Sequence, residues 1–355
     1  GETVHTSGGY YVMKHRLFRF LVEEMGFRAF AIESPWQAAE LTSRYVATCQ
    51  GTVVDAARGL FGIWQSQETA DLFEWMCSWN QAHPRDPISF FGFDIQQPWD
   101  DGPRLIADLQ RLGMAADDPR IAGIRQCDSV ETSEYPNPVP DSTHQACLQA
   151  MDGVDQFLRV LDPSDEVQPS RAEVEWAKIR AISLRAWEDE AYFEFRDDPL
   201  SSTSRDRGMA TVFQRIRKLR VGPARTAIWA HNVHVEKRST ETLIETTMGT
   251  FLDQELGKKY ASIALASAVP SINWRGIGCG LFFTFDDAIE KRLALLGEDF
   301  LLVDLSFKGA RDPYIEDVVI WLGTRWSAPR RQFDALVYLA ESPMMTPLRW
   351  PATCP

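Results

Sequence analysis

Short apolar segments of strand length alternate along this chain with amphipathic helical segments. Between residues 12 and 25 apolar side chains recur at intervals of three and four, and Gly26 follows where a helix C-cap is expected. Residues 27–32 then form an apolar run that stops at Glu-Ser-Pro, and proline cannot continue a central strand. The same succession returns at residues 66–82 and 88–93. This alternation predicts an α/β fold in which helices flank a mostly parallel central sheet.

The middle of the chain has a different pattern. A loop rich in Pro and acidic residues precedes long helical patterns such as residues 171–196, and no convincing strand occurs there. Further strand candidates come later, at residues 227–230, 260–267, 300–305 and 335–340. We therefore predict an α/β core formed by residues 1–116 and 222–355, with residues 117–221 inserted as a helical lid or subdomain over a pocket.

The composition of the chain narrows the choice of partners. A net charge of −13 with a pI near 5.0 repels nucleic acids and anionic membranes, and no apolar run reaches the roughly 18 to 20 residues of a membrane span. The six cysteines have no metal-binding spacing and are too sparse for a disulfide scaffold, which predicts reduced thiols and a cytoplasmic location. The 12 Trp and 20 Phe residues favour a large, partly apolar small molecule as the ligand. A monomer or homodimer is expected.

Ionisable residues stand where the predicted strands end. Glu33 follows the run RAFAI, Asp94 follows ISFFGF, and His231 follows RTAIWA. The carboxyl ends of parallel strands lie along one edge of a sheet, and ligands bind in the crevice outside that edge. If the opening Gly-Glu also ends a strand, its neighbours reach the same edge. The predicted crevice then contains Glu2, His5, Glu33, Asp94, His231 and His234.

Such a crevice suits the activation of water. A neutral His accepts a proton near pH 7, a neighbouring carboxylate orients it, and a further His or Arg stabilises an oxyanion. The chain has no GxSxG, Walker or GxGxxG motif, which disfavours a serine hydrolase, a P-loop NTPase and a Rossmann dehydrogenase. Direct hydrolysis without a covalent acyl-enzyme is the simplest interpretation.

Structural interpretations stay open for several of these residues. Asp94 equally suits a turn, and one of His231 and His234 is expected to be a hydrogen-bonded structural residue. The helical position of Lys14 predicts a surface residue or one that supports the site from behind. No role is assigned to two histidines in polar contexts, His83 and His144.

A set of motifs occurs in one order along the chain. They are GE-x-x-H at the start, the strand ending in Glu33, FGFDIQ at 91–96, RDRGMA at 205–210, WAHNVH at 229–234, Met-Gly at 248–249 with LGKKY at 256–260, and FDALVYL at 333–339. Each motif alone is weak, but the ordered set covers nearly the whole chain. In this set the sequence resembles the erythromycin esterase family, which includes hydrolases of the succinoglycan biosynthesis protein type.

The resemblance implies an α/β fold with a helical insertion and a deep cleft. It also implies hydrolysis of esters or lactones, macrolactones included, without a metal or other cofactor. By position, His5 matches the general base of the family, Glu33 its partner carboxylate and Glu2 the preceding acid, while His231 and His234 match the cleft histidines. His231 is expected to be catalytic with these three residues, and either His231 or His234 is expected to polarise the carbonyl. The residues expected to bind substrate are His234, Asp94, Lys14, Arg205, Asn232 and Trp36.

The chain departs from the family pattern after the histidine. Thr6 stands where Gly is typical, Gly9 where a Glu is expected, and Lys14 where Arg is frequent. The missing acid at Gly9 motivates an alternative to hydrolysis of a macrolactone or polyketide-like product, namely cyclisation, elimination or acyl transfer on a natural-product intermediate. Two further alternatives are a non-catalytic binder and a metal-dependent hydrolase with the ligands Glu2, His5, Glu33, His231 and His234.

Overall fold

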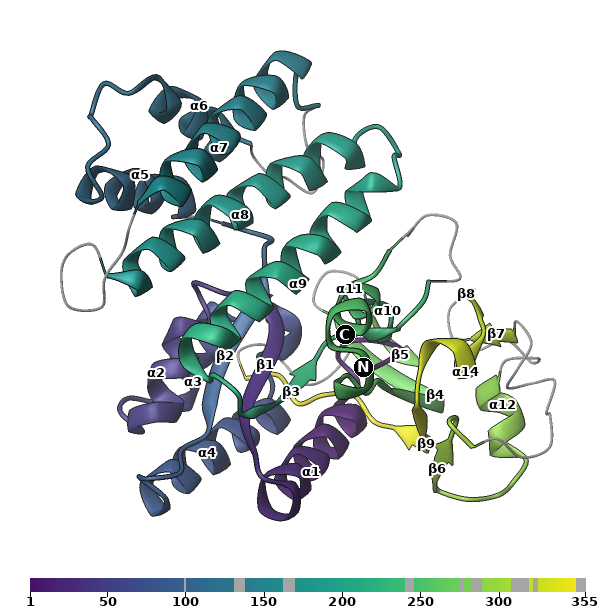
Figure 1. Ribbon diagram of the computed structural model, residues 1–355. Coiled ribbons are helices and arrows are strands. Elements are labelled where there is room, and N and C mark those ends of the chain that lie inside the picture. The colour runs from purple at the N-terminus through teal and green to yellow at the C-terminus, as the bar shows by residue number, and fades with distance from the viewer. Residues whose placement is uncertain are drawn as a thin grey trace. The chain divides into compact units, whose positions relative to one another are not determined.

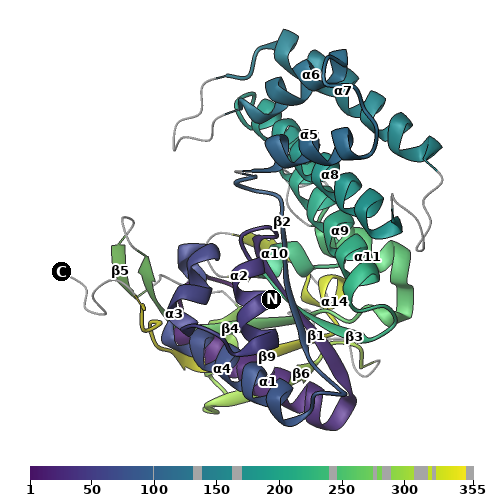
Figure 2. The ribbon, with the colours of Figure 1, turned by 90° about the vertical axis from the view of Figure 1, so that its left-hand side faces the viewer.

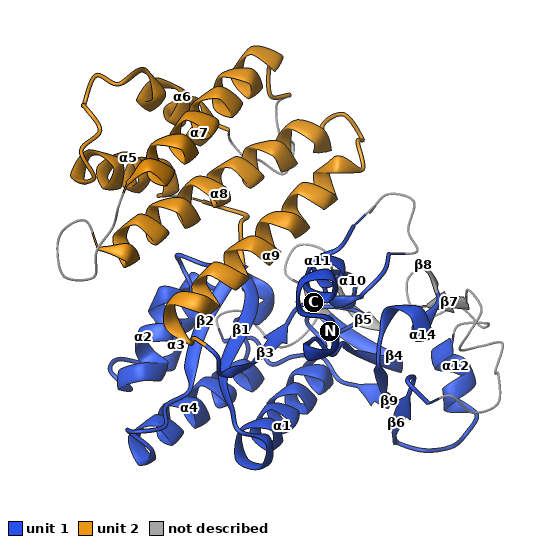
Figure 3. Cartoon of the chain, viewed as in Figure 1, with its two compact units in different colours: residues 1–92, 223–241, 246–355 blue, residues 93–222, 242–245 orange. Residues whose placement is uncertain are grey.

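The computed structural model describes residues 1–98, 100–130, 138–161, 170–239, 246–274, 278–281, 289–307, 319–321 and 325–348. The chain divides into two compact units (Figure 3). The first contains residues 1–92, 223–241 and 246–355, and the second contains residues 93–222 and 242–245. The helical unit therefore begins at residue 93, whereas the sequence placed the start of the insertion at residue 117.

A three-stranded sheet organises the first part of unit 1 (Figure 1). Its order is β2-β1-β3, formed by β2 (Ser89–Asp94), β1 (Phe27–Pro35) and β3 (Arg225–Trp229). β1 and β3 are parallel, with Phe30 opposite Ala227 and Ile32 opposite Trp229. Because β1 is buried from Ala29 to its end, its sequence is a continuous apolar run rather than an alternating one.

Two helices pack on this sheet through aromatic and aliphatic side chains. α1 (Gly8–Met25) contributes Tyr10, Tyr11 and Phe18 to the core, and α4 (Gln67–Ala82) contributes Phe73 and Met76. α1 ends at Gly26 in the left-handed conformation (φ 70°), as its C-cap position predicts. α4 begins where the Ser66 hydroxyl accepts a hydrogen bond from the backbone N–H of Thr69. The two smaller helices α2 (Glu40–Thr48) and α3 (Val53–Ala56) lie between β1 and α4 in the sequence.

A second sheet of unit 1 has the order β5-β4-β9-β6. Its strands are β5 (Gly278–Leu281), β4 (Ile263–Trp274), β9 (Ala335–Ser342) and β6 (Phe300–Asp304). β4 and β9 are parallel, whereas β5 and β6 pair antiparallel at the two edges. Further described elements of unit 1 are α10 (Asn232–Val235), α11 (Met248–Leu256), α12 (Ile289–Ala294), α14 (Pro329–Gln332), three short 3-10 helices η1 (Ala57–Gly59), η2 (Gly62–Trp64) and η3 (Gly257–Lys259), and the antiparallel pair β7 (Val319–Trp321) and β8 (Arg325–Ser327).

The predicted α/β class with parallel strand pairing is confirmed, and the sheet is more divided than predicted. Among the described residues, the strands that were expected in one sheet belong to separate sheets, and antiparallel strands close the edges of the second. Periodicity in a single sequence gives the type of an element but not its hydrogen-bonding neighbour, which explains the difference.

Unit 2 is helical. It contains α5 (Asp101–Arg111), α6 (Pro119–Asp128), α7 (Asp141–Val160), α8 (Arg171–Glu194) and α9 (Leu200–Arg220). α8 and α9 run side by side in both views (Figure 1, Figure 2). α8 begins at a capping box in which Ser170 and Glu173 satisfy each other's backbone N–H groups. The core of the unit has its own apolar cluster, formed by side chains of α5 to α8 such as Leu109, Ile124 and Leu184.

Two disulfides contradict the prediction of reduced thiols. Cys49 is bonded to Cys77 and Cys127 to Cys147. The partners are 28 and 20 residues apart in the sequence, and helix packing brings them together. The spacing of the cysteines therefore does not predict these pairs. The side chains of the cysteines at 279 and 354 lie outside the described residues. The prediction is wrong for the four paired cysteines, and the inference from free thiols to a cytoplasmic location loses its basis.

None of the helices in the described ranges combines the length and the apolar character needed to cross a membrane.

Candidate active site

The opening residues of the chain lie beside the end of β3. The backbone N–H of Glu2 donates to the carbonyl of Ala230 (3.2 Å), and the N–H of Asn232 donates to the carbonyl of Glu2 (2.8 Å). The opening segment is not assigned as a strand, but these bonds fix it against the segment that follows β3. Glu2 and His5 therefore lie beside His231, at the carboxyl end of β3.

Glu2 links a histidine and a lysine. His5 Nδ1 lies 2.9 Å from Glu2 Oε1, and the Lys14 ammonium contacts Glu2 Oε2. Glu2 is fully buried, whereas the His5 side chain is 15% exposed. Because a carboxylate only accepts hydrogen bonds, this contact places a proton on His5 Nδ1, and Nε2 is the nitrogen that can accept a proton from water.

Lys14 is buried on α1 rather than exposed. Its Nζ lies 4.6 Å from the centre of the Trp229 ring. Burial lowers the pKa of Lys14 well below its usual value, and the charge of Glu33 opposes this effect. The structure thus places Lys14 behind Glu2, as a residue that supports the site.

Glu33 holds the segment that carries the other two histidines. Its Oε2 accepts the backbone N–H of His231 (2.7 Å), and its Oε1 lies 3.3 Å from Nε2 of His234. The indole N–H of Trp64 donates to the Glu33 carbonyl (2.5 Å). The His5 ring packs edge-on against the Trp64 ring, with 5.2 Å between their centres. Glu33 is thus itself fixed by a backbone contact at the end of its own strand.

Both ring nitrogens of His231 are engaged within the protein. Nε2 lies 2.7 Å from the carbonyl of Thr3, which can only accept, so Nε2 carries the proton. Nδ1 accepts the N–H of Val233 (3.3 Å) as the N-cap of α10. The His231 ring lies 5.1 Å from that of His5. This arrangement gives His231 a neutral, fixed tautomer beside the first histidine.

Asn232 connects three parts of the chain. Its amide donates to the carbonyl of Leu265 on β4 (3.0 Å) and to the hydroxyl of Thr3 (3.3 Å), while its oxygen accepts the N–H of Leu265 (3.4 Å). The contacts of Asn232 therefore join the opening segment to the second sheet of unit 1.

Trp36, another of the residues expected to bind substrate, follows β1 directly and is buried in the same unit.

Asp94 and Arg205 form a pair in unit 2. The guanidinium donates through Nη2 (2.7 Å) and Nε (3.3 Å) to the two Asp94 oxygens, and Asp94 is fully buried. Nearby in the hydrogen-bond network, the amide of Gln96 donates to Glu190 Oε1 (2.7 Å). Burial raises the pKa of Glu190 to about 8, opposed by Arg205 and reinforced by Asp94. Glu190 lies within a long helix, and nothing in its sequence context marks it.

The loop after His5 has a backbone conformation that a β-branched residue rarely adopts. Thr6 has φ 66° and is buried. Its N–H donates to the hydroxyl of Tyr11 (2.8 Å), which donates to the carbonyl of Ile63 (2.8 Å), and its own carbonyl accepts the N–H of Met345 (2.9 Å). The Gly that is typical of the family at this position indicates such a conformation, because Gly adopts positive φ without strain.

Gly9 has a packing reason to lack a side chain. A Cβ at this position would lie 2.6 Å from Ser342 Oγ and 2.9 Å from Ser342 Cα. The start of α1 therefore approaches the end of β9 so closely that a larger residue at position 9 would require this part of the backbone to shift.

The alternative metal site receives no geometric support. Glu2 is engaged with His5 and Lys14, and Glu33 with the segment of His231 and His234. Within the described part of the chain, no three donor atoms of Glu2, His5, Glu33, His231 and His234 lie within 4.8 Å of one another.

These features define an α/β protein with histidine–carboxylate pairs at one edge of its sheet. The sequence model of the erythromycin esterase family matches residues 22–342, so the chain belongs to the erythromycin esterase family. The match begins after Glu2, His5 and Lys14.

Curated relatives and solved structures agree with this assignment. The chain is 24% identical to the putative hydrolase YbfO of Bacillus subtilis (strain 168) over 292 residues, which are 75% of this chain and 63% of YbfO. It is 30% identical to erythromycin esterase type II of Escherichia coli over 95 residues, which are 27% of this chain and 22% of that protein. The chain thus spans less than two thirds of the length of these curated relatives.

Among solved structures, the fold is similar to a mutant of the erythromycin esterase EreC in its open conformation, with a TM-score of 0.74 and 17% identity over 97% of this chain and 90% of EreC. It is also similar to a succinoglycan biosynthesis protein, with a TM-score of 0.71 and 18% identity over 97% and 88% of the two chains. At these identities the comparison shows the fold.

Proposed function

We propose that the protein hydrolyses an ester or lactone bond, with His5 as the general base that activates water. The observation that carries the proposal is the contact of His5 Nδ1 with the buried carboxylate of Glu2. This contact holds the imidazole in one tautomer and stabilises the imidazolium that forms when Nε2 takes a proton. Membership of the erythromycin esterase family supports the ester class.

The remaining residues divide the work around this base. Lys14 contacts Glu2 from behind, and a proton shared in this contact holds the carboxylate in position against His5. Glu33 contacts Nε2 of His234 and favours its imidazolium form, whose second ring N–H is the group proposed to polarise the substrate carbonyl. His231 binds the carbonyl of Thr3 and keeps the opening loop in place. In this mechanism water attacks directly, and no acyl-enzyme forms.

The proposed substrate is a large, partly apolar small molecule such as a macrolactone or polyketide-like product. Erythromycin esterase type II and EreC, to which this chain is similar, carry erythromycin in their names, and this favours a lactone-bearing natural product. The non-hydrolytic alternative was motivated by the missing acid at Gly9. Because the family to which the chain belongs supports the ester class, hydrolysis is the function that we favour.

The proposal is tested by substitution of the base. We expect His5→Ala to lower kcat by about 10²- to 10⁴-fold, the range that a positioned general base contributes. The assay is a panel of esters and lactones with product detection by mass spectrometry, run in ¹⁸O-labelled water. His83→Ala, an exposed histidine that stacks on Trp79, is the matched control.

Two results would contradict the proposal. Turnover by His5→Ala at the wild-type rate would remove the general-base role. Turnover by the wild type without ¹⁸O in the product would exclude hydrolysis and favour cyclisation, elimination or acyl transfer.

A further inference from the structure

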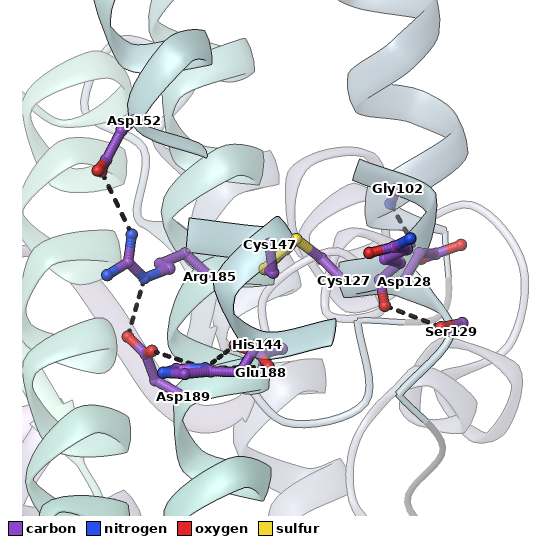
Figure 4. Close-up of a disulfide and its surroundings, with 11 residues drawn as sticks. Gly102, Cys127, Asp128, Ser129, His144, Cys147, Asp152, Arg185, Glu188 and Asp189 are labelled. Carbon is purple, nitrogen blue, oxygen red and sulfur yellow. Dashed lines mark hydrogen bonds and ion pairs between the residues drawn. A yellow bond between two sulfur atoms is a disulfide. The ribbon is translucent and has the colours of Figure 1, made fainter. Parts of the chain in front are cut away.

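Three side chains of types that can bind metal ions lie close together between two helices of unit 2 (Figure 4). His144 lies on α7, and Glu188 and Asp189 are consecutive on α8. His144 Nδ1 is 2.9 Å and 3.2 Å from the two oxygens of Glu188 and 4.0 Å from Oδ1 of Asp189. One donor atom from each residue lies within 4.8 Å of the other two. The proposed function uses none of these residues.

The donors are held in place by their surroundings. Glu188 is fully buried and His144 is 6% exposed. The imidazole stacks on the Tyr192 ring, with 3.7 Å between the centres and 7° between the planes. Arg185 donates to the second oxygen of Asp189 (3.0 Å), which fixes that carboxylate. Imidazole and carboxylate ligands of metal ions are typically oriented by such outer contacts.

The distances agree with the coordination of a metal ion. At the metal–ligand distance of about 2.0–2.1 Å that Zn²⁺ makes with nitrogen and oxygen donors, the donors of a tetrahedral ion lie about 3.3–3.4 Å apart. The separations of His144 Nδ1 from the Glu188 oxygens (2.9 and 3.2 Å) and from Asp189 Oδ1 (4.0 Å) lie on either side of this value. The 20% exposure of the Asp189 side chain leaves the cluster accessible from one side.

The local charge supplies an independent argument. In the described part of the chain, the cluster and the groups bonded to it include four carboxylates and two guanidinium groups, so that its surroundings are acidic: Asp141, Asp152, Glu188, Asp189, Arg185 and Arg196.

We propose that His144, Glu188 and Asp189 form a binding site for a divalent first-row metal ion. Imidazole with carboxylate ligands suits Zn²⁺, and an ion bound here would connect α7 to α8. The site is structural, lies apart from the histidine–carboxylate site of unit 1 in the sequence, and does not depend on the proposed function. The competing interpretation is a protonated His144 paired with Glu188 and no metal.

The test uses the full chain after dialysis against a chelator. Titration calorimetry with ZnCl₂, and Co²⁺ absorption in the visible range, are expected to report one ion bound at this cluster. Glu188→Gln keeps the shape of the side chain and removes its charge, and His144→Gln removes the imidazole. We expect each to weaken Zn²⁺ binding by at least about 100-fold, because a direct ligand contributes more than the 10- to 100-fold typical of outer contacts.

Asp152→Asn is the matched control. It removes a carboxylate that contacts Arg185 but not the metal donors, so Zn²⁺ binding is expected to stay within a few-fold of the wild type. Zn²⁺ should raise the melting temperature of the wild type and of Asp152→Asn but not of the two ligand variants. Circular dichroism of the metal-free variants shows whether they fold.

Three outcomes would overturn the proposal. They are the absence of Zn²⁺ and Co²⁺ binding by the wild type, binding that is unchanged in both ligand variants, and an NMR titration in which His144 takes up a proton while neither metal perturbs its signals. The last result would assign the cluster to a proton-linked ion pair.

Discussion

Thr6 has an unusual backbone conformation and directly follows His5, the proposed general base. A Thr in the left-handed region costs on the order of 1–3 kcal/mol and persists only where its surroundings fix it. The hydroxyl of Tyr11 and the backbone of Met345 provide that fixation. Since Thr6 directly follows His5, the same bonds determine where the imidazole lies.

Removal of the Tyr11 hydroxyl should therefore affect both stability and rate. Tyr11→Phe leaves the N–H of Thr6 and the carbonyl of Ile63 without this partner, at a cost of about 1–3 kcal/mol in the free energy of unfolding. We expect kcat to fall while KM changes little, because the base is displaced rather than the substrate contacts. Urea denaturation and steady-state kinetics measure the two effects.

The control for this prediction is Tyr45→Phe, which removes a hydroxyl from a half-buried residue of α2 and should leave stability and kcat within error of the wild type. Equal effects of the two substitutions would exclude a special role for Tyr11.

Glu190 gives the protein a pH dependence that a single substitution can isolate. Its folded-state pKa of about 8 lies above the ordinary value of 4.5, so the folded state binds more protons than the unfolded state between these pH values. The contribution of Glu190 to stability is complete below pH 4.5 and is lost as the pH rises through 8. Each pKa unit by which Glu190 differs between the folded and unfolded states corresponds to about 1.4 kcal/mol in the free energy of unfolding.

Glu190→Gln should remove this contribution. The variant keeps an oxygen that accepts from Gln96 but does not ionise, so the difference in unfolding free energy from the wild type should move in favour of the variant between pH 5 and pH 8. Urea denaturation at several pH values measures the difference. Glu24→Gln, an exposed residue of α1, should show no such trend, and a constant difference for Glu190→Gln would show that Glu190 does not titrate in this range.

At the scale of elements, the two disulfides each join a pair of helical segments. Cys49, at the end of α2, is bonded to α4, and Cys127 on α6 is bonded to α7. Closing loops of this length stabilises a fold by roughly 2–4 kcal/mol per bond in the chain-entropy description. The bond between α6 and α7 also restrains the helix that carries His144.

Thiol counting tests both bonds. Because four of the six cysteines are paired, the protein denatured without reductant should show no more than two reactive thiols, and all six after reduction. Reduction should also lower the melting temperature. Six reactive thiols before reduction, in protein purified without reductant, would contradict the disulfides.

The whole molecule contains two compact units, and the second begins at residue 93, whereas the sequence placed the start of the insertion at residue 117. The insertion was predicted from helical periodicity and from the absence of strand patterns. α5 precedes the predicted boundary but belongs to the second unit, because its apolar side chains pack against α8. The boundary depends on which core a helix joins, and no local pattern encodes that choice. The expected deep cleft and lid stay predictions.

The sequence alone determined the alternation of helices and strands, the Gly26 cap, and the residue types available for chemistry at the strand ends. These features are local, because periodicity, caps and turns act over a few residues. Only the tertiary structure decided that Glu2 contacts the ring of His5, that both nitrogens of His231 are occupied, and that Cys127 meets Cys147. Such pairings depend on distances between residues far apart in the chain, and those distances exist only once the elements have packed.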